Sequence, residues 1–146
     1  MGQMGRYVER VAEDIQWLRA HAGDLGVAMP ETVDSIYMGG GTPSLLPPEE
    51  LKKLFFTIRQ EFKVLPKAEI TVECAPGTLA DPVIQTLVTR GVNRVSLGVQ
   101  SFAERELAQT GRRHRAATRG LRSAGHGRVS VAEIDLDRPW LTRFID

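Results

Sequence analysis

Apolar residues recur every three or four positions in several segments of the 146-residue chain, which is the spacing of helices that bury one face. The predicted helices span residues 6–20, 47–62 and 81–91. The third of them begins at Asp81 and Pro82, which fit an N-cap followed by a proline at the first helical position. Two more helices are predicted, over residues 101–109, where a serine and a glutamate have capping-box spacing, and over residues 116–124.

Short runs rich in β-branched residues lie between these helices and predict strands. The predicted strands span residues 33–38, 69–73, 94–99 and 128–136. Strands that alternate with helices are typical of βαβ units, whose right-handed crossovers build a parallel sheet. We therefore predict an α/β fold with about four parallel strands, and we expect ligands to bind at the carboxyl ends of those strands.

The charge balance is nearly even, because 19 basic and 18 acidic residues leave a formal net charge of +1. That balance argues against an overall electrostatic grip on nucleic acid or on an anionic membrane. Seven arginines lie between Arg105 and Arg128, and we interpret them as a solvated surface, since aromatic stacking partners are scarce there. The chain has no apolar run long enough to span a bilayer and no secretory signal at its N-terminus, so we expect a cytoplasmic protein.

The strongest local feature follows the first predicted strand, where Gly39, Gly40 and Gly41 precede Thr42 and Pro43. Three glycines let the backbone approach a ligand closely and adopt positive φ angles. Their carbonyls could accept hydrogen bonds from an ammonium group, and their N–H groups could hold an anion. The alternative interpretation is a plain tight turn, and the spacing of a phosphate-binding loop is absent from this segment.

Polar residues also end the next two predicted strands. Glu73 shares a face with Glu69 by strand alternation, and it is either a ligand for hydroxyl and ammonium groups or half of an ion pair. Gln100 offers donors and an acceptor to a polar ligand, or it caps the helix that follows. Cys74 is the one cysteine of the chain, which excludes an internal disulfide and any zinc or cluster site built from several of its cysteines.

Four segments, in matching order and spacing, carry a family resemblance. They are VDSIYMGGGTPSLLPPEEL (33–51), EITVECAPGTL (69–79), GVNRVSLGVQSF (91–102) and TGRRH (110–114). Together they resemble the radical S-adenosylmethionine (SAM) enzymes related to oxygen-independent coproporphyrinogen III oxidase, and most of all the branch of HemW-type haem chaperones. The resemblance implies an incomplete (βα) partial barrel, SAM as a ligand, and a parent function in haem or porphyrin metabolism, with porphyrin or haem as a further partner.

The same resemblance implies roles for individual residues. In this family a [4Fe–4S] cluster, held by a Cys-x-x-x-Cys-x-x-Cys loop, chelates SAM. The glycine motif from Gly39 to Pro43 matches the segment that meets the SAM amino group, and Glu73 matches a glutamate that contacts SAM. Gln100 matches the glutamine of the family's VQSF segment. Arg112 matches an arginine that we expect to pair with the SAM carboxylate.

The chain also departs from the family pattern, because the first strand and the three-cysteine loop have no counterpart in it. We therefore expect a fragment that is catalytically silent by itself. We expect residues 1–136 to form the partial barrel and residues 137–146 to be a divergent tail from a truncated or frame-shifted gene, which sequencing of the locus would test. The alternatives are a non-catalytic module that binds SAM or a porphyrin, and a remnant that does not fold stably.

Overall fold

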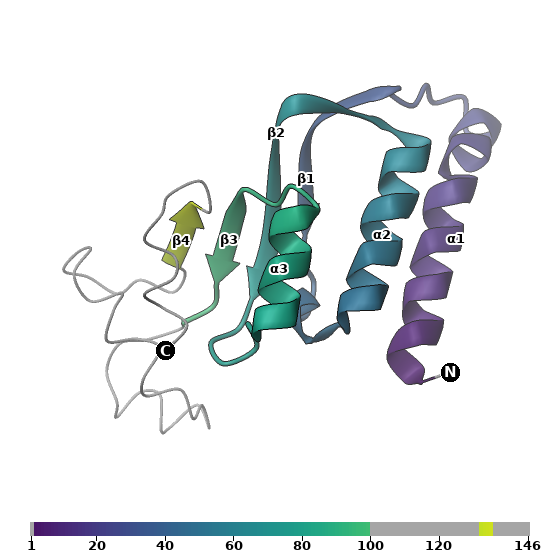
Figure 1. Cartoon of the computed structure of the whole chain (residues 1–146). Coiled ribbons are helices and arrows are strands. Elements are labelled where there is room, and N and C mark those ends of the chain that lie inside the picture. The colour runs from purple at the N-terminus through teal and green to yellow at the C-terminus, as the bar shows by residue number, and fades with distance from the viewer. Residues whose placement is uncertain (1, 100–131, 136–146) are drawn as a thin grey trace.

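The computed structural model describes residues 2–99 and 132–135, and these form a sheet with helices packed on one face (Figure 1). The helices are α1 (Gln3–Asp24), α2 (Pro48–Glu61) and α3 (Asp81–Thr89), with a short 3₁₀ helix, η1 (Pro43–Leu45). The strands are β1 (Thr32–Met38), β2 (Lys63–Cys74), β3 (Arg94–Leu97) and β4 (Ala132–Asp135). The predicted helices over 101–109 and 116–124, and the tail 137–146, lie outside the described residues.

The sheet has the strand order β1-β2-β3-β4, and its first three strands are parallel. This confirms the α/β prediction for the strands that α2 and α3 connect. The prediction of a fourth parallel strand is wrong, because β4 pairs antiparallel with β3. The residues 100–131 between β3 and β4 lie outside the described part, and hydrophobic pattern alone does not encode strand direction.

The core lies between the sheet and the helices that cover it. From β2, Ala68, Ile70, Val72 and Cys74 alternate into one buried cluster, as the period of two in a strand requires. Helices α2 and α3 supply the opposing apolar side chains, which are Leu51, Phe55, Val83 and Leu87. Helix α1 lies alongside α2 (Figure 1) and buries Val8 and Ala12.

Arginines from neighbouring helices satisfy carbonyl oxygens that the ends of α2 and α3 leave without helical partners. Arg19 of α1 donates to the backbone oxygen of Glu61 at 2.8 Å, at the end of α2. Arg59 of α2 donates to the backbone oxygen of Arg90 at 2.8 Å, just after α3. A cation also suits the negative end of a helix dipole, so these contacts fix the register of the three helices.

Element boundaries differ from the sequence prediction at three places. Strand β2 begins at Lys63, well before residue 69, with an irregularity in its pairing to β1. Strand β3 ends at Leu97, which pairs with Cys74, the last residue of β2, and the N–H of Val99 then turns back to the carbonyl of Leu97. Helix α3 has Ala80 as its N-cap, so the predicted cap at Asp81 is wrong, and that carboxylate instead lies in the first turn.

Candidate functional site

The carboxyl ends of β1 and β2 lie side by side, because Tyr37 of β1 pairs with Thr71 and Met38 pairs with Val72. On the face away from the helices, strand alternation presents polar side chains from three strands. We call this set the polar face. Its members are Ser35 and Tyr37 from β1, Glu69, Thr71 and Glu73 from β2, and Arg94 and Ser96 from β3.

The glycine motif forms the loop that leaves β1, between Met38 and the 3₁₀ helix η1. Gly40 has φ +90°, a left-handed conformation in which residues with a side chain are strained. Gly39 is needed for a different reason. A Cβ at that position would lie 2.8 Å from Cδ of Glu73 and 2.9 Å from Cε1 of Tyr37. The backbone at Gly39 is thus approached closely by two protein side chains, and the predicted close approach of a ligand to the glycines stays a prediction.

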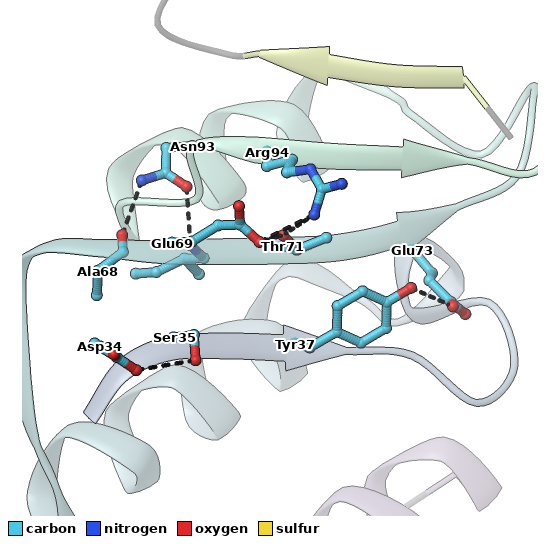
Figure 2. A network of polar contacts seen from close by, with 10 residues as sticks. Asp34, Ser35, Tyr37, Ala68, Glu69, Thr71, Glu73, Asn93 and Arg94 are labelled. Carbon is cyan, nitrogen blue, oxygen red and sulfur yellow. Dashed lines mark hydrogen bonds and ion pairs between the residues drawn. The ribbon is translucent and has the colours of Figure 1, made fainter. Parts of the chain in front are cut away.

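Glu73 reaches back toward this loop from the end of β2. Its Oε1 accepts a hydrogen bond from the Tyr37 hydroxyl at 2.7 Å (Figure 2). Its Oε2 accepts one from the backbone N–H of Gly40 at 3.3 Å. The bond to Glu73, together with desolvation and the negative charge of that carboxylate, raises the pKa of Tyr37 above its ordinary value.

The second carboxylate of the polar face has a different environment. Arg94 forms an ion pair with Glu69 at 3.0 Å, and Thr71 donates to the same carboxylate at 3.1 Å (Figure 2). The sequence left open whether Glu73 is half of an ion pair or a ligand. The structure places the arginine on Glu69, four residues earlier on the same strand, and gives Glu73 the uncharged donors Tyr37 and Gly40. A carboxylate with uncharged donors still carries its negative charge toward a cationic ligand.

A buried hydroxyl pair ties the loop after β1 to the loop after β2. Ser44 of η1 is 2% exposed, and its hydroxyl makes a very short hydrogen bond with the hydroxyl of Thr78. Thr78 donates in turn to the backbone oxygen of Ala75 at 2.7 Å. The loop after β1 is thus tied to the loop after β2, just beyond Glu73. Sequence analysis missed Tyr37, Ser44 and Thr78, since their roles depend on the register of β1 against β2.

An apolar pocket of about 430 Å³ borders the glycine loop. It lies between α1, α2 and β1, and its walls include Val11, Ile15, Ile36 and Leu54. Gly39, Gly40 and Gly41 line one end of it. The loop therefore borders both an apolar pocket and the polar face, so a ligand at the strand ends has polar and apolar surfaces within reach.

The residues fit the two cofactors implied by the resemblance to different degrees. Glycine carbonyls and the Glu73 carboxylate are suitable acceptors for the ammonium group of SAM. A [4Fe–4S] cluster needs several thiolates, whereas the chain has one cysteine. Cys74 is buried, and burial raises the pKa of its thiol to about 11. Within the described part, no three His, Cys, Asp or Glu side chains are grouped to hold a metal.

Of the residues singled out in the sequence, the structure brings Gly39 and Gly40 into contact with Glu73, with Gly41 and Thr42 continuing the same loop and Pro43 opening η1. Gln100 and Arg112 lie outside the described residues. The part that is described is a parallel α/β sheet with a glycine loop and a carboxylate at adjacent strand ends, the usual position for ligands in such sheets. It is thus an α/β protein whose first three strands are parallel.

Comparison with known proteins gives the family. The sequence profile of the radical SAM superfamily matches residues 6–125. The chain is 40% identical over 114 residues to the haem chaperone HemW of Synechocystis sp., covering 78% of this chain and 26% of that protein. It is 50% identical over 70 residues to the oxygen-independent coproporphyrinogen III oxidase of Bradyrhizobium diazoefficiens, covering 48% and 16%. The chain therefore belongs to the radical SAM superfamily.

A solved structure agrees with this assignment. The fold matches coproporphyrinogen III oxidase (HemN) from Escherichia coli, a radical SAM enzyme, with a TM-score of 0.60 and 25% identity. The match covers 77% of this chain and 25% of that one. The resemblance stated from the four motifs, and the partial barrel expected from it, are thereby confirmed. The chain spans about a quarter of the HemW and HemN chains. In the described part, no helix is both long and apolar enough to cross a bilayer.

Proposed function

We propose that this part of the chain is the SAM-binding portion of a radical SAM protein of the HemW and coproporphyrinogen III oxidase type. The observation that carries the proposal is the position of Glu73, whose carboxylate contacts the glycine loop at the carboxyl edge of the sheet. The ammonium group of the SAM methionine moiety donates to this carboxylate and to carbonyls of Gly39–Gly41. An ammonium group has three N–H donors, so it can engage both partners at once.

The remaining site residues extend this arrangement. We propose that Gln100 provides further polar contacts to SAM. We propose also that Arg112 pairs with the SAM carboxylate, because a guanidinium binds a carboxylate in a bidentate manner. Both proposals rest on motif positions in the sequence.

We do not assign the reductive cleavage of SAM, after which the superfamily is named, to this chain alone. Its own side chains do not match a [4Fe–4S] cluster, since it has one buried thiol. The relatives are named for haem delivery and for coproporphyrinogen oxidation. On that likeness we propose that the whole protein acts in haem or porphyrin metabolism and meets a porphyrin or haem through segments beyond those described.

Calorimetric titration of the purified chain with SAM tests the binding proposal. We expect saturable binding of one SAM per chain, and we expect Glu73→Gln to weaken it at least tenfold, which is about 1.4 kcal/mol. Glu69→Gln is the matched control, because Glu69 lies on the same strand and face but pairs with Arg94. No saturation by about 1 mM SAM, or an equal loss in both variants, would contradict the proposal.

A further inference from the structure

The hydrogen bond between Tyr37 and Glu73 joins β1 and β2 across the site. It is a side-chain contact, separate from the backbone ladder that pairs the two strands. Tyr37 pairs in register with Thr71, so Glu73 is its diagonal neighbour, two residues further along β2. The ring spans that diagonal and places its hydroxyl 2.7 Å from Oε1 of Glu73. Figure 2 shows the ring lying along the polar face with its hydroxyl directed at the carboxylate.

We propose that Tyr37 is a positioning residue that holds the Glu73 carboxylate ready for the cationic end of its ligand. This inference rests on the proposed function, in which that cation is the ammonium group of SAM. Glu73 is only half-buried, and a free glutamate side chain loses rotamer entropy when it is ordered. The Tyr37 bond orders the carboxylate before the ligand arrives, so less of that entropy is lost on binding.

The packing around the pair supports a built arrangement. The edge of the Tyr37 ring and the carboxyl carbon of Glu73 both lie within 3 Å of the position that a Cβ on Gly39 would take, 2.9 and 2.8 Å respectively. The backbone N–H of Gly40 holds the second carboxylate oxygen. Each carboxylate oxygen offers about two acceptor sites, and among the described residues each accepts one bond, which leaves one acceptor site per oxygen for a ligand N–H. The carboxylate is thus fixed by two donors without being saturated.

The tyrosine remains protonated under the conditions in which it must donate. Its hydroxyl bond to Glu73 and the nearby negative charge both disfavour the tyrosinate, which raises the pKa of Tyr37. The hydroxyl is also close to solvent, since Tyr37 is 61% exposed. An exposed cross-strand hydrogen bond contributes little to the stability of the fold, so a role in positioning and a role in folding give different results on mutation.

Tyr37→Phe separates the two roles, because it removes the hydroxyl and keeps the ring. We expect SAM affinity to fall about fivefold to tenfold, or roughly 1 kcal/mol. We expect the midpoint of urea unfolding to stay within error. The matched control is Ser35→Ala, which removes a hydroxyl from the same strand and face; that hydroxyl bonds to Asp34 and not to Glu73, so SAM affinity should not change.

A second measurement needs no ligand. The chain has two tyrosines, so Tyr7→Phe leaves Tyr37 as the only one. Its ionisation can then be followed by near-ultraviolet absorbance, and we expect Glu73→Gln in that background to lower its pKa toward the ordinary value. If the unmodified chain fails to bind SAM, the proposed function fails and the inference falls with it. If it binds, and Tyr37→Phe binds equally well or Glu73→Gln leaves the tyrosine titration unmoved, the inference alone is wrong.

Discussion

A single methyl group added at Gly39 would push against the side chains of both Glu73 and Tyr37. A Cβ there would lie 2.8 Å from Cδ of Glu73 and 2.9 Å from Cε1 of Tyr37. Both atoms belong to side chains that can move, so Gly39→Ala should displace the carboxylate while changing the free energy of unfolding by less than about 1 kcal/mol. We expect SAM affinity to fall at least tenfold in calorimetry.

Gly23→Ala is the control for this substitution. Gly23 lies in α1, and a Cβ there would meet nothing within 4 Å. Alanine in a helix is favoured over glycine by up to about 1 kcal/mol, so stability should hold or rise and SAM binding should not change. Unchanged binding by Gly39→Ala would show that the contact between the loop and Glu73 is not needed for the ligand.

Because of Cys74, the free energy of unfolding should depend on pH in the alkaline range. Burial raises the pKa of its thiol from 9.0 to about 11, so the folded state keeps its proton longer than the unfolded state does. Below pH 9.0 the thiol contributes no pH dependence, because both states are protonated. Between pH 9.0 and about 11 the unfolded state ionises first, and stability falls by at most about 2–3 kcal/mol.

Urea unfolding at a series of alkaline pH values measures this effect. Other groups titrate in the same range, so the informative quantity is the difference between the parent chain and Cys74→Ala. We expect the free energies of unfolding of the two proteins to converge as the pH rises. Parallel curves would show that the thiol ionises in the folded state as easily as in the unfolded state.

At the scale of elements, Asn93 links the start of β3 to the edge of β2. Its side-chain Oδ1 accepts from the N–H of Ile70 at 2.8 Å, and its Nδ2 donates to the carbonyl of Ala68 at 2.9 Å (Figure 2). The side-chain amide of Asn93 thus makes the kind of hydrogen bonds to β2 that one further backbone pair of the ladder would make. We predict that Asn93→Ala lowers the free energy of unfolding by about 2 kcal/mol, since it leaves two partly buried backbone groups without partners.

Chemical denaturation of Asn93→Ala beside Gln85→Ala checks this prediction. Gln85 is exposed on α3, so its replacement should change stability by no more than about 0.5 kcal/mol. Equal effects of the two substitutions would mean that solvent replaces the Asn93 bonds without loss.

The sequence predicted helices and strands well where one face is buried. The apolar residues of α2 recur at helical spacing, and that stripe, with Leu51 and Phe55, is the one that packs on the sheet. The sequence predicted the boundaries of these elements less well. The early part of β2, from Lys63 to Lys67, is mostly exposed, so no alternation marks it as a strand. The Ala80 cap likewise lacks the side-chain signal that cap prediction depends on.

For the whole molecule, topology could be predicted only where local units determine it. The crossovers through α2 and α3 imply parallel neighbours, and β1, β2 and β3 follow that rule. The direction of β4 depends on the connection from β3, which a local pattern does not specify. The same limit applies to the site. Its location at the strand ends follows from the fold class, but the partnership of Tyr37 with Glu73 follows from register.

The composition of the whole chain sets a limit on its chemistry that no local feature changes. A [4Fe–4S] cluster in this family takes three thiolates, and this chain offers one thiol, which is buried and protonated at neutral pH. After anaerobic reconstitution with iron and sulfide, we predict far less than one cluster per chain. With SAM and a strong reductant, we predict no 5′-deoxyadenosine, because the cluster supplies the electron for that cleavage.

Iron and sulfide content per chain, together with chromatography of the SAM products, checks this last prediction. Cys74→Ser is the control, and it should give the same background of bound iron, because a thiol that faces the core does not reach a cluster at the surface. Two chains sharing a cluster through Cys74 would instead show iron that disappears in Cys74→Ser and a mass that rises on reconstitution. A stoichiometric cluster that forms 5′-deoxyadenosine would show that the chain has cluster ligands besides cysteine thiolates.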